Sequence, residues 1–188
     1  MKYALRELKG TYGYIRKQLI FEIIKTLILF AMALGIFFIG YFTLHTKKSL
    51  WSILAVLALL PASKSLVGVI MLARFKSLKN DVYERYVNAV GPIPALYENI
   101  LTTSERSYFV PVICIASRSL AAFMPDGNAK ALKAHLEKVL QTAGHNVTVK
   151  VFDREDAFFE RLSQLKDKAE EEGKTYENVF DTIKAVSL

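Results

Sequence analysis

The first half of the chain carries two long runs of apolar residues. Leu27 to Leu44 contains eighteen residues without a charge, and Leu50 to Ala73 contains twenty-four that are interrupted only by Lys64. At about 1.5 Å per residue, a helix over the first run is about 27 Å long, close to the hydrocarbon thickness of a bilayer. The five residues 45–49 join the runs. The pattern therefore predicts a transmembrane helical hairpin.

The spacing of apolar residues changes after Arg74. It predicts a helix over 78–90 that ends at the Gly-Pro stop after it, and a short helix over 94–101. Residues 108–116 are rich in β-branched side chains and almost wholly apolar, which indicates a buried strand. Pro111 within them favours an early or edge position, because proline cannot donate to a ladder of backbone hydrogen bonds.

The rest of the chain alternates strands and helices. Asn128 is placed to cap one helix and Asp153 another. Apolar and polar residues alternate along 147–152, which predicts a sheet with one covered face and one wetter face. The remaining elements are expected, in order, as a strand, a helix, a strand and two helices over 120–124, 129–143, 147–152, 153–171 and 176–186.

These elements predict an N-terminal transmembrane helical hairpin followed by a small α/β (α+β) domain with a roughly three-stranded sheet and packed helices. The expected organisation is a cytoplasmic N-terminal segment over 1–26, the hairpin over 27–74 and a cytoplasmic domain over 75–188. A chain of 188 residues that is 52% hydrophobic is too apolar to be disordered.

The net charge of +7 divides unevenly along the chain. Residues 1–74 carry ten basic and two acidic side chains, a net of +8, whereas residues 75–188 carry fifteen basic and sixteen acidic ones, a net of −1. A neutral domain does not favour binding to nucleic acid. Nine basic residues flank the outer ends of the two runs and two lie in the link, which predicts a multi-pass protein of the cell membrane with both termini cytoplasmic.

Two residues of the second run are unusual for a membrane span. Pro61 cannot donate to the carbonyl of Leu57, and Lys64 lies about ten residues from Arg74. A cation deep in a bilayer marks a functional site by default, and Ser63 and Ser65 could satisfy the free carbonyl and the ammonium group. The alternatives are a lysine that reaches the interface or is deprotonated, or a run that does not fully cross.

Small residues recur along both runs at helical spacing. They predict either a seam between copies of the chain or close packing within the hairpin, because small side chains let helix backbones approach each other. The helix-packing candidates are Ala31, Gly35, Ala55, Ala58, Ala62, Ser65 and Gly68. Glu22 and Lys25 are one turn apart and are expected to pair.

No catalytic residue, cofactor or metal site is predicted. The three histidines lack ligands at metal-binding spacing, and Cys114 among β-branched neighbours indicates a buried structural thiol. The acidic cluster at 153–156 could hold a divalent cation together with Asp126, but a helix cap with acids near the positive end of the helix dipole is the favoured interpretation.

The segments SYFVPVICIASRSLAAF and HLEKVLQTAGHNVTVKVFDREDAFFERL resemble a family of bacterial two-helix membrane proteins. The resemblance implies the same layout of a hairpin and a small cytoplasmic α/β domain over most of the chain. Some members carry an automatic label that links them to O-GlcNAc transferases. The resemblance implies no established activity and no functional residues.

Three functions remain open from the sequence. The first is a membrane-anchored interaction or scaffold module that binds a protein partner or a second copy of itself. The second is an oligomeric membrane assembly with a polar path around Lys64. The third, less favoured, is an enzyme at the inner membrane face. The lipid bilayer is the one partner common to all three, and nucleic acid is a partner in none.

Overall fold

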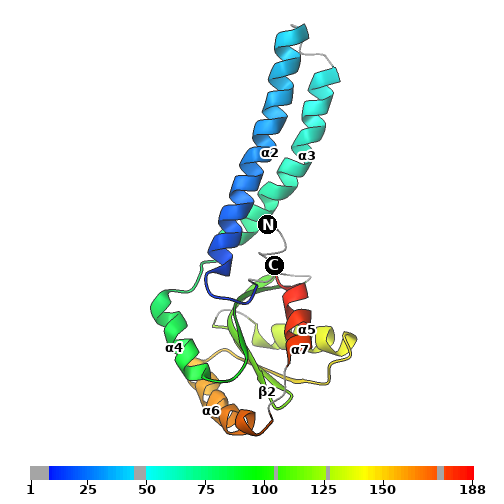
Figure 1. Cartoon of the computed structure of the whole chain (residues 1–188). Helices are drawn as coiled ribbons and strands as arrows, with labels where there is room; N and C mark the ends of the chain where they lie inside the picture. The colour runs from blue at the N-terminus through cyan, green and yellow to red at the C-terminus, as the bar shows by residue number, and fades with distance from the viewer. Residues whose placement is uncertain (1–8, 45–49, 104–105, 126–127, 173–175) are drawn as a thin grey trace. The chain divides into compact units, whose positions relative to one another are not determined.

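A computed structural model describes residues 9–44, 50–103, 106–125, 128–172 and 176–188. These residues form six helices and a four-stranded mixed sheet, grouped in two compact units (Figure 1). One unit is Ile15–Lys76. The other combines Ser77–Leu188 with the described residues 9–14, so the chain enters this domain, leaves it for the hairpin and returns.

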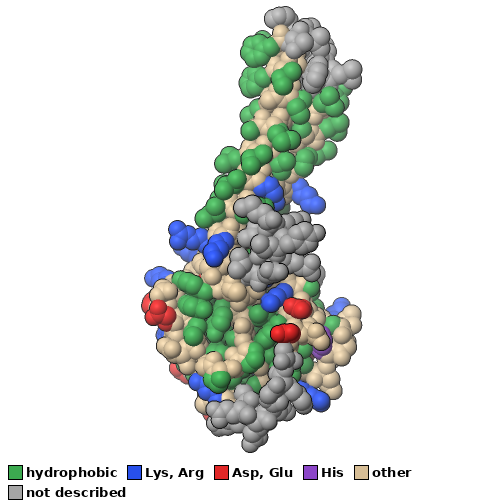
Figure 2. All heavy atoms as spheres, viewed as in Figure 1, with side chains coloured by type: hydrophobic (Ala, Val, Ile, Leu, Met, Phe, Trp, Pro, Cys, Tyr) green, Lys and Arg blue, Asp and Glu red, His purple; other side chains and the backbone are tan. Residues whose placement is uncertain are grey.

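The hairpin consists of α2 (Tyr14–Leu44) and α3 (Leu50–Ala73). α3 coincides with the second apolar run, whereas α2 begins thirteen residues before the first. Only 17% of each apolar window is buried, and hydrophobic side chains project along most of the visible outside of both helices (Figure 2). The prediction of two helices that are long and apolar enough to cross a membrane is therefore confirmed.

The domain contains a sheet of four strands instead of the expected three. Its order is β1-β2-β3-β4, with the first three antiparallel and the last parallel to β3. The additional strand is β1, in the segment expected to be a short helix, because pairing with β2 overrides the local helical preference. The strands are β1 (Ala95–Thr102), β2 (Ser107–Ala116), β3 (Ser119–Phe123) and β4 (Thr148–Phe152).

Pro111 lies inside β2, which is a central strand, and so the expected early or edge position is wrong. Two features explain why the sheet tolerates it. Its partner position on β1 is Glu98, which has a φ of 52° and leaves a gap in the ladder of paired residues. On the other side the ladder with β3 begins only at Val112. Neither neighbour therefore needs the missing N–H of Pro111.

Four further helices cover both faces of the sheet. α5 and α7 pack on one face, which we name the first core, and α4 and α6 pack on the other, the second core. The expectation that one face of the sheet is more open to solvent is therefore wrong. Only β4 alternates as predicted, because it is an edge strand with Thr148 and Lys150 exposed. The helices are α4 (Asn80–Val90), α5 (Ala129–Thr142), α6 (Glu155–Glu172) and α7 (Glu177–Val186).

Caps and turns agree with most of the predicted boundaries. Asn128 Oδ1 accepts the N–H of Ala131 at 3.2 Å, which confirms the predicted cap of α5. Residues 117 and 118 both have positive φ, the backbone that a two-residue hairpin turn requires. The carbonyl of Arg154 accepts the N–H of Phe158, so the cap position of α6 is Arg154 and not the expected Asp153.

The outer edge of β1 is paired with two chain segments, one that precedes the hairpin in the sequence and one that follows it. The N–H of Tyr97 donates to the carbonyl of Gly10 at 2.7 Å, and the N–H of Leu188 donates to Ile100 at 2.9 Å. Lys9 Nζ donates to two carbonyls at the end of α7, at 2.6 and 3.2 Å. Residues 9–10 are therefore an integral part of the domain.

Candidate functional site

A group of polar side chains crosses the interface of the hairpin, and we name it the polar level: Glu22, Lys25, Thr26, Lys64 and Ser65. Thr26 Oγ1 donates to Ser65 Oγ at 2.8 Å, and Ser65 Oγ donates to Glu22 Oε2 at 3.3 Å. Lys25 forms an ion pair with Glu22, which confirms the expected pairing. The network joins α2 to α3 and sets their register at this level.

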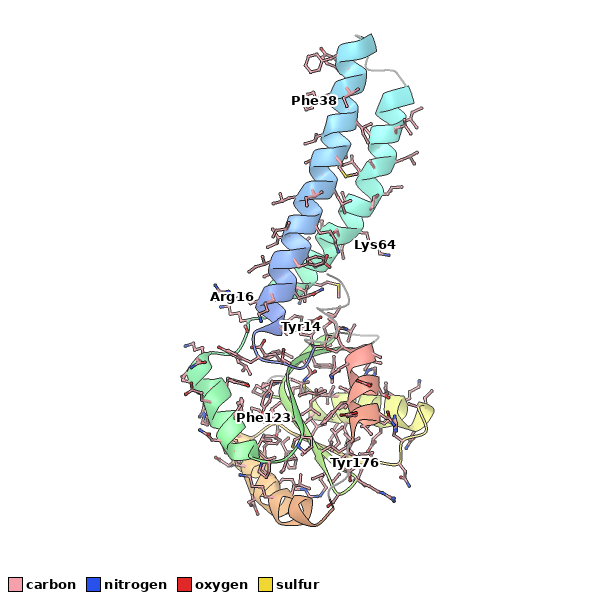
Figure 3. All side chains as sticks on the ribbon, in the orientation of Figure 1. Tyr14, Arg16, Phe38, Lys64, Phe123 and Tyr176 are labelled. Carbon is pink, nitrogen blue, oxygen red and sulfur yellow. The ribbon has the colours of Figure 1, made fainter. Side chains whose placement is uncertain are left out.

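Lys64 projects to the outside of the hairpin and is exposed (Figure 3). No described carboxylate forms an ion pair with it. Pro61 is also exposed, within an α3 that continues through it. The two neighbouring serines do not act as expected: Ser63 donates to the carbonyl of Leu59 at 2.9 Å, and Ser65 belongs to the polar level.

The small residues of α3 face α2. Ala55, Ala62 and Ser65 are buried between the helices, while Ala58 and Gly68 are half-buried. The two candidates on α2 lie elsewhere. Ala31 is exposed, and a Cβ built on Gly35 has nothing within 4 Å.

Three other residues of α2 follow a repeat of seven. They are Thr26, Ala33 and Gly40, all buried. A repeat of seven is the spacing that keeps one helix face against a partner, and small side chains along it permit close approach. This spacing is visible in the sequence, but the spacing of four between Ala31 and Gly35 obscures it.

Cys114 is a buried structural thiol, as predicted. Its side chain is fully buried in the second core, and its Sγ donates to the carbonyl of Ala121 at 3.5 Å. Burial raises the pKa of the thiol from 9.0 to about 12. The group is therefore protonated at neutral pH and is a poor nucleophile.

The other ionisable groups of the domain do not gather into a site. Within the described ranges, no three His, Cys, Asp or Glu side chains lie close enough to hold a metal ion. His145 Nε2 lies 3.0 Å from Thr182 Oγ1, and burial followed by the charge of Lys138 lowers the pKa of His135. Asp153 is exposed, and Asp126 lies outside the described residues.

Sequence reasoning missed a buried polar pair on β1. Glu98 and Asn99 are each 1% exposed. One carboxylate oxygen of Glu98 accepts the hydroxyl of Ser77 at 2.5 Å and the N–H of Leu78 at 2.9 Å, which fastens the start of the returning chain to the sheet. Glu98 Oε2 and both amide atoms of Asn99 have no hydrogen-bond partner among the described residues. Their signal, two polar residues inside an apolar segment, is weak in a sequence.

The described residues thus contain two polar groups of interest, the polar level in the hairpin and the Glu98–Asn99 pair in the domain. The first is partly open to the surroundings and carries charge, whereas the second is sealed. Comparison of the chain with protein-family models, curated proteins and solved structures finds no match.

Proposed function

We propose that this chain is a membrane-anchored interaction module, with the hairpin in the lipid bilayer and both of its ends on the cytoplasmic side. The observation that carries the proposal is the distribution of exposed apolar side chains. Every large hydrophobic side chain that is exposed among the described residues lies between Ile20 and Ile70. Leu27, Phe42 and Leu60, for example, are 64%, 68% and 65% exposed.

Such a surface is unstable in water. A monomeric soluble protein exposes contiguous apolar patches of at most a few hundred Å². A hairpin that is apolar on its outer faces and joined by small side chains inside is suited to lipid, where helix packing depends on close approach. The described part of the domain is the opposite, with its hydrophobic side chains in two cores.

Chain continuity and charge support the proposed orientation. Residues 9–14 and Ser77–Leu188 belong to one compact unit, so α2 begins and α3 ends on the same side of any membrane that the hairpin crosses. The basic residues Arg16, Lys17, Arg74 and Lys76 lie at this end of the helices. An excess of basic residues marks the cytoplasmic side.

The open edge of the sheet is the element that we propose for binding a partner. The N–H of Thr148 donates to the carbonyl of Arg118, and the carbonyl of Phe152 accepts the N–H of Met124. The backbone N–H and C=O groups of residues 148, 150 and 152 therefore point to β3. The backbone groups of Val149 and Val151 therefore point to the free edge. The opposite edge, β1, is already occupied. An extended segment of another protein could add to β4 as a further strand.

Alkaline extraction and cysteine labelling test the membrane anchor. The chain should stay with membranes at alkaline pH. In Asn146→Cys, a membrane-impermeant thiol reagent should label the protein only after the cell membrane is opened, whereas Thr46→Cys in the link should react in intact cells. Buried Cys114 supplies the unreactive background. Extraction into the soluble fraction, or the reversed labelling pattern, contradicts the proposal.

Site-specific photo-crosslinking tests the open edge. A photoreactive residue at exposed Thr148 should form a discrete product, whereas one at exposed Asn178 on α7 should not. Val151→Pro removes an N–H that points to the open edge and should abolish the product, while protection of Cys114 shows that the domain is still folded. A product that persists in Val151→Pro contradicts strand addition.

A further inference from the structure

We propose that Lys25 and Lys64 together bind the phosphate of an anionic phospholipid, on one face of the hairpin and at the inner boundary of its apolar part. The inference rests on the proposed membrane anchor and adds a ligand class to it. Three observations support it: the register of the helices, the side on which the two lysines lie, and the charge that remains at the polar level.

The register changes the depth at which Lys64 lies. Counted along the sequence, Lys64 is nine residues inside the end of α3 at Ala73. The hydrogen bond between Thr26 and Ser65, however, places Ser65 opposite Thr26. A Cβ on Gly68 would lie 3.6 Å from Glu22 Oε2, which agrees with the same antiparallel register. Lys64 is thus level with the first residues of the charge-free run and not with its middle.

Helical geometry puts Lys25 and Lys64 on the same side of the hairpin. Thr26 and Ser65 point at each other, and each lysine precedes one of them. One step back along an α-helix turns the side chain by about 100°. Because α2 and α3 run in opposite directions, these turns have opposite sense when seen from one end, and both lysines reach the same face.

The polar level lies at one end of an apolar section of the hairpin, and this section is about as long as the hydrocarbon core of a bilayer is thick. Above it, α2 has no charge from Leu27 to Leu44, and α3 has none from Leu50 to Ser63. The first stretch is about 27 Å long, against about 30 Å for the hydrocarbon core. In Figure 2, the described Lys and Arg side chains visible on the hairpin gather toward this end.

The remaining charge matches one phosphodiester. Glu22 forms its ion pair with Lys25, and no described acid pairs with Lys64. Two ammonium groups and one carboxylate leave one net positive charge. Both lysines are accessible, since the side chain of Lys25 is 40% exposed and Lys64 is exposed, whereas Thr26 and Ser65 bond to each other inside the hairpin. An anionic headgroup can therefore contact both lysines without displacing the Thr26–Ser65 bond.

The test compares lipids with equal chains and different headgroups. The full chain is reconstituted in phosphatidylcholine bilayers, and the fraction of spin-labelled lipid that is immobilised at the protein is measured for phosphatidylglycerol and for phosphatidylcholine. We expect a preference for phosphatidylglycerol that falls about fivefold in Lys64→Gln, the effect of one lysine near an anionic surface. It should fall further when Lys25→Gln is added and persist in Lys64→Arg.

Matched variants identify the charge that matters. Lys17 lies nearer the start of α2, outside the polar level, so Lys17→Gln should lower the preference for phosphatidylglycerol less than Lys64→Gln does. Lys130→Gln on α5 should not change this preference. Equal binding of both lipids, or a preference lost in Lys17→Gln but kept in Lys64→Gln, overturns the proposal. If the chain resists alkaline extraction but shows no headgroup preference, only this inference fails. If it is extracted, the membrane anchor fails as well.

Discussion

Truncation of the Phe158 side chain should clearly lower the stability of the domain, and the rate at which Cys114 reacts with a thiol reagent can measure the loss. Phe158 is fully buried in the second core, with its ring centroid 5.6 Å from that of Phe123 and 6.0 Å from that of Phe152. Cys114 is the one cysteine of the chain and is buried in the same core. A thiol reagent therefore reaches it only when the domain opens.

The size of the effect follows from the lost volume. Replacing a buried phenylalanine by alanine costs about 3–5 kcal/mol, because contacts are lost and a cavity remains. When the domain recloses faster than the reagent reacts, the rate of labelling is proportional to the population of the open state. Since 1.4 kcal/mol is tenfold, Phe158→Ala should accelerate labelling of Cys114 by about 10² to 4 × 10³-fold.

The assay uses the full chain in detergent at neutral pH, with a chromogenic disulfide as the reagent. Phe158→Leu, which keeps most of the volume, should accelerate labelling far less. Phe42→Ala on the exposed face of α2 should leave the rate unchanged. An unchanged rate in Phe158→Ala would refute the reasoning, because Cys114 would then be reached by a local opening that does not involve the second core.

Three other predictions concern the free energy of unfolding of the full chain, measured by denaturant titration with Cys114 labelling. Burial raises the pKa of Cys114 from 9.0, and that of Tyr97 from 10.0, to about 12, so the unfolded chain loses protons that the native domain keeps. The stability that these two groups contribute should therefore be lost as the pH rises from about 9 to 12. Gly10→Ala should lower stability by more than about 1 kcal/mol, because Gly10 has a φ of 82° and a Cβ there would lie 2.6 Å from Leu96 Cδ2. Asn99→Leu should raise stability by about 1 kcal/mol, because it removes two buried polar atoms that find no partner in the described part of the chain.

Each of these predictions has an internal control. Cys114→Ala, followed by circular dichroism in place of labelling, should flatten the start of the decline above pH 9. Gly13→Ala has a similar positive φ of 76° but open space around the new methyl group, so it separates backbone strain from the clash. A loss of stability in Asn99→Leu would mean that the amide has a structural role that its contacts do not reveal.

Long periodic signals in the sequence predicted most of the elements. The charge-free runs identify the hairpin, and β2, α5, β4 and α6 follow from apolar spacing with recognisable turns between them. These signals are local, since each depends on neighbours within one or two turns. The beginning of α2 at Tyr14 was not predicted, because Arg16, Lys17, Glu22 and Lys25 interrupt the apolar pattern without interrupting the helix.

β1 was missed because its stability comes from a distant partner. The segment Ala95–Thr102 contains alanine, leucine and glutamate, which favour helices locally. It becomes a strand by pairing with β2 along its length, at the cost of a positive φ at Glu98 and a distorted ladder opposite Pro111. Propensity within the segment carries no information about that pairing.

The depth of Lys64 was beyond the sequence for a related reason. A count along α3 measures distance from its own end, but the level within a hairpin depends on the register with α2. That register is set by Thr26 and Ser65, which are 39 residues apart. Thr26 lies next to a charged residue at the start of an apolar run, and nothing local marks it as a contact.

The closure of β1 by Gly10 has a consequence for the order of events during synthesis. Residues 9–14 are made before the hairpin, and the strand and helix that they contact are made after it. The early segment is therefore made well before its contacts exist, because the whole hairpin unit, Ile15–Lys76, is made first and, as we propose, enters the bilayer. Completion of the domain then ties both ends of the hairpin together. A hairpin inserted with its ends on opposite sides would leave the domain unable to close, so folding of the domain would itself select the correctly inserted molecules.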